Sequence, residues 1–246
     1  MPATRERSMP PEPPEAIRSL GGFALFQGLD DDSLRRIEDR CRWRRFRPGQ
    51  TILEPGSTSR EVYFIADGAV RVVNFTLSGR EIAFADIGAG EFFGELAVID
   101  GLPRTAGVRA VSDCLIGVVP ADAFVGLLHT HAEVAFRVLE RLVYVIRVCD
   151  DRIMDFATLG AMQRVYAELL RIAVPDAAVP GMWVVRPCPT EREIASRAGT
   201  ARETVARAIK QLRQVGLVRR KDRKLYILDR ARLETITRAL GSGVRT

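Results

Sequence analysis

PTEREIASRAGTARETVARAIKQLRQVGLVRR, residues 189–220, is the stretch that says most about how this chain folds. Thr190 with Glu193, and Thr200 with Glu203, have the Thr-x-x-Glu spacing at which two side chains satisfy free backbone amides at the start of a helix. An Ala-Gly step between the two pairs supplies a tight turn. The stretch therefore predicts two short helices joined by a glycine turn.

A basic hairpin is predicted directly after these helices, in LVRRKDRKLYIL, residues 217–228. A small shared core for the helices comes from Ile194, Ala195, Val205 and Ile209. Two helices, a glycine turn between them and a short hairpin form the outline of a winged helix-turn-helix.

The second helix carries the candidate DNA-reading side chains. Helix periodicity puts Arg202, Glu203 and Arg207 on one face, opposite the inward Val205 and Ala208. Arginine can hydrogen-bond the major-groove edge of guanine, and a carboxylate can accept from the cytosine amino group. An Arg-Glu face of this kind is also common on solvated helices, and Glu203 is already explained as a cap. The further DNA-binding candidates are Thr200, Lys210, Arg220 and Lys221.

The charge of the chain is concentrated at its C-terminal end. From residue 186 to 246 there are sixteen Lys or Arg and six Asp or Glu, an excess of ten, whereas the whole chain has a net charge of +6. Such asymmetry indicates a polyanion-binding module attached to a nearly neutral domain, although a solvated basic tail has the same composition.

Residues 49–120 have the pattern of an all-β domain, preceded by one helix within residues 29–46. Short apolar runs are separated by Gly or Asp-Gly punctuation, which is typical of a β-sandwich or β-roll. The predicted strands are TILE, EVYFIA, AVRVVNF, EIAFADI, AGVRAV and CLIGVV. Residues 1–17 contain five prolines and predict a disordered leader.

A long helix is predicted for residues 131–159. Its apolar residues recur at gaps of three and four, which is typical of a helix-pairing seam, but one face could equally pack on the β domain. The predicted organisation is α+β: leader 1–17, β-roll 18–130, dimerisation helix 131–159 and winged helix-turn-helix 160–246. The seam residues are Leu139, Leu142, Ile146, Cys149, Ile153 and Phe156.

FFGELAVIDGLPRTAG, residues 92–107, raises the possibility of an anion pocket. A cyclic nucleotide offers a ribose hydroxyl and a ring phosphate. The fork of Arg104 suits the phosphate, because it can make two charge-assisted bonds, and the carboxylate of Glu95 can accept from the hydroxyl. Gly94 lets the backbone approach closely, before a short helix whose free amides add positive potential.

These residues carry a resemblance to a known family. FGELAVIDGLPRTA resembles the phosphate-binding cassette of cyclic-nucleotide-binding domains, and TARETVARAIKQL resembles the recognition helix of the cAMP receptor protein. From about Phe23 to Leu233 the chain resembles transcription regulators of the cAMP receptor protein and fumarate-nitrate regulator (CRP/FNR) superfamily.

The resemblance implies roles for particular residues. Glu95 would hold the ribose hydroxyl and Arg104 the cyclic phosphate, with Gly94, Leu96 and Thr105 lining the cassette. The Arg202, Glu203 and Arg207 triad would read TGTGA-like half-sites of a palindrome in double-stranded DNA, and RNA polymerase would be a further partner.

One departure from the family pattern concerns the base of the nucleotide. Where the cAMP receptor protein has a Thr-Ser pair, this chain has Cys149 and Asp150. Asp150 could accept hydrogen bonds from guanine, so the expected effector is cAMP or cGMP, and the expected assembly is a homodimer through the 139–156 seam.

Other classes of function are less compatible with this composition. No apolar run approaches the roughly 20 residues that span a bilayer, so we expect a cytoplasmic protein without a membrane partner. Four scattered cysteines and two histidines predict neither a metal site nor an enzyme. The main alternative is an effector-independent or redox-responsive regulator, with a vestigial cassette and a reactive Cys149.

Overall fold

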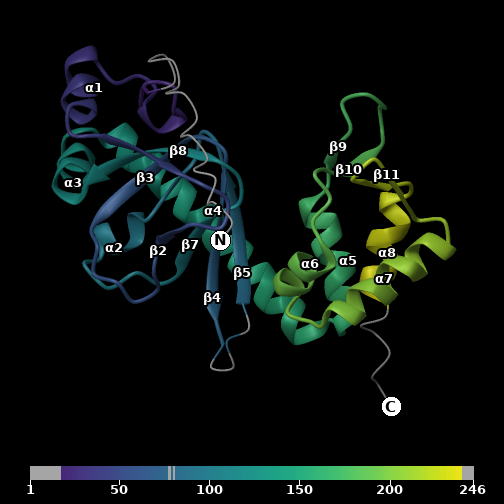
Figure 1. Ribbon diagram of the computed structural model, residues 1–246. Coiled ribbons are helices and arrows are strands. Elements are labelled where there is room, and N and C mark those ends of the chain that lie inside the picture. Colours follow the sequence, from purple (N-terminus) through teal and green to yellow (C-terminus); the bar gives the residue numbers. More distant parts are fainter. Residues whose placement is uncertain (1–17, 77–78, 80, 240–246) are drawn as a thin grey trace, which may run out of the picture. The chain divides into compact units, whose positions relative to one another are not determined.

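The computed structural model describes residues 18–76, 79 and 81–239, and its elements are drawn in Figure 1. The described chain forms two compact units. The first contains the residues up to 72 together with 86–138, and the second contains 73–85 together with the residues from 139 onward. The leader predicted for residues 1–17 lies outside the described part.

The strands form a β-roll that lies mostly in the first unit, with residues 73–85 counted in the second, and every strand predicted from the sequence is present. Two four-stranded sheets have the orders β1-β8-β3-β6 and β2-β7-β4-β5. The strands are β1 (Arg42–Phe46), β2 (Thr51–Leu53), β3 (Glu61–Asp67), β4 (Ala69–Phe75), β5 (Glu81–Gly88), β6 (Phe92–Phe93), β7 (Gly107–Ala110) and β8 (Cys114–Pro120).

Strand β3 is buried on both of its faces, which explains its continuous apolar sequence. Tyr63 and Ile65 point into the core of the roll, where Ile116 of β8 is also fully buried. Phe64 points the other way and contacts Phe23 at 5.4 Å between ring centroids. Successive strand residues face opposite sides, so four consecutive apolar residues are needed when both sides are covered.

The short helix predicted within residues 29–46 is present. Helix α1 (Asp31–Glu38) begins where Asp30 accepts a hydrogen bond from the amide of Ser33 at 2.8 Å. Residues 42–46 are instead strand β1, paired with β8. In that segment apolar Trp43 lies between charged neighbours, and the backbone groups are used in the ladder, so the helix ends before this part of the segment.

The long helix predicted for residues 131–159 is present as one element. Helix α3 (Ala121–Thr130) ends at His131, and α4 (Ala132–Thr158) follows for 27 residues. Val134 and Val138 at its start are buried against the β-roll unit, whereas large apolar side chains further along are exposed. These exposed side chains include Leu139 (57%), Ile146 (58%), Ile153 (63%) and Phe156 (52%).

The second unit has the winged helix-turn-helix that the sequence predicts. Its core joins Leu169, Ile194, Leu212 and Leu225, each fully buried. A small antiparallel sheet has the order β11-β12-β10-β9. The elements are α5 (Ala161–Ile172), β9 (Val174–Pro175), β10 (Trp183–Val185), α6 (Glu191–Ala198), α7 (Arg202–Gln214), β11 (Val218–Lys221), β12 (Lys224–Ile227) and α8 (Arg230–Ala239). Among the described helices of both units, none is long and apolar enough to span a bilayer.

Candidate nucleotide-binding and DNA-binding sites

The cassette residues lie together between β6 and β7. Gly94 adopts a left-handed backbone, with φ of 89°, immediately before the short helix α2 (Glu95–Ile99). A Cβ atom on Gly94 would lie 2.9 Å from Nη1 of Arg104 and 3.0 Å from the carbonyl oxygen of Glu61. Only glycine therefore allows the backbone to pass so close to the arginine.

Arg104 is buried, and the β-roll itself supplies hydrogen-bond acceptors for its guanidinium. Nη1 donates to the carbonyl of Gly94 at 2.6 Å, Nη2 to the carbonyl of Glu61 at 2.8 Å, and Nε to Ser59 Oγ at 3.0 Å. The side chain is only 2% exposed. Three of the five guanidinium N–H groups are thus used inside the protein.

Burial and the charges of neighbouring groups, Glu95 among them, affect the pKa of Arg104. Burial lowers the pKa of Arg104, while Tyr63, Glu61 and Glu95 act in the opposite direction. The Glu61 carboxylate lies 3.6 Å from Nη2, and the guanidinium carbon lies 5.8 Å from the Tyr63 ring centroid. Burial and the neighbouring Glu61 raise the pKa of the Tyr63 phenol to about 12.

The sequence did not identify Ser59, Glu61 or Tyr63 as members of this cluster. Glu61 and Tyr63 lie on β3, more than 40 positions before Arg104 in the chain. The one local signal is a carboxylate, Glu61, directly before the apolar run of β3.

The remaining predicted ligand residues belong to two different units of the chain. Thr105 and Leu96 are exposed beside Arg104 and Glu95, within the first unit. Cys149 and Asp150 are exposed on α4 in the second unit. Their joint participation in one nucleotide site remains a prediction.

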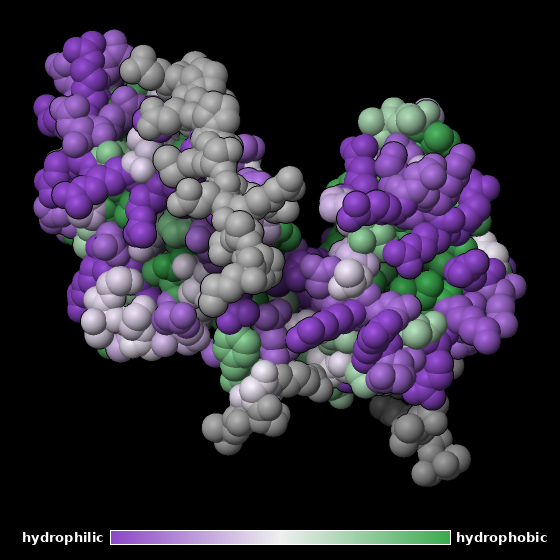
Figure 2. All heavy atoms as spheres, in the orientation of Figure 1, coloured by the Kyte–Doolittle hydropathy of each residue, from purple (hydrophilic) through white to green (hydrophobic). Residues whose placement is uncertain are grey.

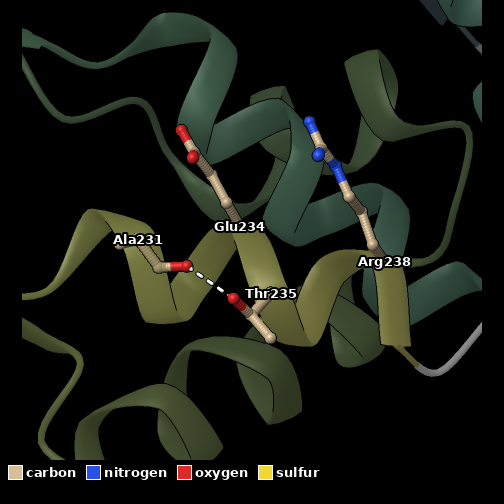
Figure 3. Close-up of a pocket in the computed structure, with 4 residues that line it drawn as sticks. All are labelled: Ala231, Glu234, Thr235 and Arg238. Atoms are coloured by element: carbon tan, nitrogen blue, oxygen red, sulfur yellow. Dashed lines mark hydrogen bonds between the residues drawn. The ribbon is translucent and has the colours of Figure 1, made fainter.

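A separate hollow of about 530 Å³ lies beside α8, far along the chain from the cassette (Figure 3). Glu234 and Arg238 point to the same side of the helix, and Thr235 donates a hydrogen bond to the Ala231 carbonyl at 2.9 Å. These residues include no thiol or imidazole. Within the described part of the chain, no group of three His, Cys, Asp or Glu side chains is arranged to hold a metal ion.

Helix α7 presents the predicted reading face to solvent. Arg202, Glu203, Arg207 and Lys210 are exposed, whereas Val205, Ala208 and Leu212 are buried in the core of the unit. Arg202, with 71% of its side chain exposed, donates from Nε to Glu191 Oε2 of α6 at 3.1 Å. The arginine is therefore oriented by the first helix of the motif.

Only one of the two predicted capping boxes is present. Thr190 accepts from the amide of Glu193 at 3.3 Å, and Glu193 accepts from the amide of Thr190 at 2.7 Å. The Thr200–Glu203 box is wrong, because α7 begins at Arg202 with Ala201 as its cap. The amide of Thr200 donates to the carbonyl of Ala195 at 3.0 Å, so Thr200 closes the end of α6 instead.

The wing carries the basic hairpin predicted from the sequence. Arg220 and Lys221 are exposed on β11. Asp222 and Arg223, with φ of 49° and 59°, form the tight turn to β12, as a two-residue hairpin requires. Figure 2 shows hydrophilic side chains over much of the visible face of the second unit.

Comparisons with known proteins match both units. Residues 43–131 match the cyclic nucleotide-binding domain, and residues 163–236 match the Crp-like helix-turn-helix domain. The chain belongs to the CRP/FNR family of transcription regulators. It is therefore a DNA-binding regulator with a cyclic-nucleotide domain, and its family is one of regulators rather than enzymes.

Individual relatives of this CRP/FNR regulator have similar lengths. A cyclic AMP receptor protein of Thermus thermophilus is 28% identical over 217 residues, which cover 88% of this chain and 98% of the relative. The cAMP-activated global transcriptional regulator CRP of Salmonella typhimurium is 27% identical over 192 residues, covering 76% and 90%. The crystal structure of a CRP/FNR-family transcriptional regulator from Thermus thermophilus has a TM-score of 0.61 at 27% identity, over 80% of this chain and 98% of that one.

Proposed function

We propose that this CRP/FNR regulator is a homodimer whose affinity for a palindromic, TGTGA-like site in double-stranded DNA is switched by a cyclic nucleotide. The observation that carries the proposal is the cassette, in which Gly94, Glu95 and Arg104 lie together and a glycine is required by contact with the arginine. A carboxylate and a guanidinium in one cassette suit a ribose hydroxyl and a cyclic phosphate.

cAMP is the first candidate for the effector. Relatives over most of the chain carry the names cyclic AMP receptor protein and cAMP-activated regulator. cGMP is the second candidate, because the carboxylate of Asp150 could accept from the ring N–H and amino group of guanine. In both cases the effector acts by shifting the population of dimer arrangements in which two α7 helices reach half-sites one helical turn apart. RNA polymerase is the further partner that family membership suggests for the DNA-bound dimer.

One observation favours an effector-independent regulator as the alternative. The Arg104 guanidinium already has acceptors on Gly94, Glu61 and Ser59, so a phosphate must compete with these groups. A redox-responsive form of this alternative would use Cys149, which is exposed on α4.

The test separates the two predicted sites by crossed substitutions. Isothermal titration with cAMP and with cGMP should show binding of one, and that binding should be lost in Arg104→Ala and weakened in Arg104→Lys, which keeps the charge but not the fork. Arg207→Ala should leave nucleotide binding intact but lose about 1–3 kcal/mol of binding free energy at the specific DNA site.

Matched arginines elsewhere serve as controls. Arg36→Ala on α1 should leave nucleotide binding unchanged, and Arg232→Ala on α8 should leave sequence discrimination unchanged. Absence of binding for both nucleotides, with specific DNA binding retained, would favour the effector-independent alternative. Loss of nucleotide binding in Arg207→Ala would contradict the division of labour between the two sites.

A further inference from the structure

Glu168 is a buried carboxylate that neither the cassette nor the reading helix uses. It lies in the middle of α5 and is 1% exposed. Three arginines from three helices surround it. Arg171 Nη1 of α5 lies 2.7 Å from Oε2, Arg152 Nη2 of α4 lies 3.5 Å from Oε2, and Arg197 Nη1 of α6 lies 3.8 Å from Oε1.

A second ion pair ties the same helices together. Arg171 also donates from Nη2 to the carboxylate of Asp155, on α4. Two ion pairs therefore connect α4 to α5. In the first, α4 supplies the cation (Arg152 to Glu168), and in the second it supplies the anion (Asp155 to Arg171). Arg197 extends the cluster to α6, the helix that packs directly on α7. We call these five residues the Glu168 cluster.

Packing helices through the buried charges of the Glu168 cluster costs solvation free energy. Burial is the largest cause that lowers the pKa of Arg152, and the neighbouring cations Arg171 and Arg197 also lower it. The Glu168 carboxylate acts in the opposite direction. Apolar side chains of similar volume often pack as well or better at such positions, because ions lose hydration on burial. An ion cluster also fixes the orientation of the helices, because its hydrogen bonds form only at particular helix orientations.

The cluster begins next to the predicted base contacts of the effector. Arg152 follows Asp150 by two positions and Cys149 by three, so all three lie within one turn of α4. A displacement of this turn would move Arg152 and Asp155 together and would pull on Glu168 and Arg171. From there Arg197 connects to the helix-turn-helix.

We propose that Glu168 is a positioning residue that transmits displacement of α4 to α6, and thereby couples effector binding to the orientation of the reading helix. The proposal rests on the proposed function, since it requires a nucleotide that changes DNA affinity. It adds the residues through which that change travels within the second unit.

The experiment measures the DNA dissociation constant with and without saturating cyclic nucleotide, and takes their ratio as the coupling factor. Arg152→Met retains the apolar stem and removes the charge, while Arg171 and Arg197 still neutralise Glu168. We expect its coupling factor to fall by about fivefold or more, within the range of ordinary allosteric coupling. Arg152→Lys keeps the charge and should retain most of the coupling. Glu168→Gln should uncouple more strongly than Arg152→Met.

The control is Glu234→Gln, which makes the same change in a side chain that is 41% exposed and pairs with Arg230 on α8. Its coupling factor should equal that of the wild type. If Glu168→Gln does not fold, as its circular dichroism and thermal melt would show, Arg152→Met decides the matter.

The proposal is overturned if a folded Arg152→Met keeps the wild-type coupling factor. An equal fold-loss of DNA affinity with and without nucleotide is one form of that result, because it leaves the ratio unchanged. A wild-type coupling factor of one is a different failure, because it would remove the proposed function itself.

Discussion

At the scale of single residues, Gly199 shows how one backbone position joins α4 to the helix-turn-helix. Its φ of 58° is left-handed, and it ends α6. A Cβ atom there would lie 2.5 Å from Cε1 of Phe156, on α4. The Phe156 ring also lies under the guanidinium of Arg164, at 5.1 Å. Arg164 in turn donates to the carbonyls of Ala198 at 3.0 Å and Gly199 at 3.3 Å.

We expect Gly199→Ala to lower the free energy of unfolding by about 2–4 kcal/mol, because it combines a left-handed alanine with an overpacked ring contact. Gly216→Ala is the matched control, since its φ is 70° but a Cβ atom there meets nothing within 4 Å. That variant should lose only about 1–2 kcal/mol. Urea unfolding of both variants measures the difference, and equal losses would contradict the steric argument.

At the scale of elements, α4 exposes a row of large apolar side chains. Leu139, Ile146 and Ile153 are all more than half exposed, at the heptad spacing predicted from the sequence. Isolated exposed apolar residues are ordinary on protein surfaces, but a repeated row on a long helix is typical of helix pairing. The row is therefore the surface on which the proposed homodimer depends.

We expect Ile146→Glu to shift the protein from dimer to monomer, because it places a charge in the centre of the paired row. Sedimentation velocity measures the change directly. Affinity for a palindromic site should fall with it, since each monomer would then bind one half-site alone. Arg147→Glu, the adjacent exposed residue outside the row, should leave the dimer intact. A dimer that survived Ile146→Glu would show that pairing uses another surface.

At the scale of the whole molecule, the second unit has a core of its own. The buried residues of this core cluster fall between Val165 and Leu233. Such a core can support an independent fold of fewer than 100 residues. The basic charge of the chain is concentrated in the same segment.

We expect residues 160–246 alone to fold with a cooperative thermal transition and to bind DNA without any response to cyclic nucleotide. Their binding should weaken steeply as salt is raised from 50 to 200 mM, because it depends on phosphate contacts. Leu212→Ala, which truncates a fully buried side chain of α7, should abolish the cooperative melt. A nucleotide response in the isolated segment would place the effector site outside the β-roll.

The sequence by itself determined the features that depend on neighbours along the chain. Alternating apolar runs identify the strands β2, β3, β4, β5, β7 and β8, and the Thr190 cap with its glycine turn identifies the first helix of the motif. The pairing of Glu95 with Arg104 was also accessible, because both belong to one short stretch. Periodicity and capping are local properties, so local sequence is enough to predict them.

Tertiary structure decided the hydrogen bonds and ion pairs that join different segments of the chain. Thr200 does not cap α7, because that helix begins after Ala201 and the Thr200 amide closes α6 instead. Arg104 is held by the carbonyl of Glu61, 43 positions away. The Glu168 cluster joins three helices whose charges look, in sequence, like ordinary solvated positions. A buried charge finds its partners only when the helices pack, and no spacing along the chain records that approach.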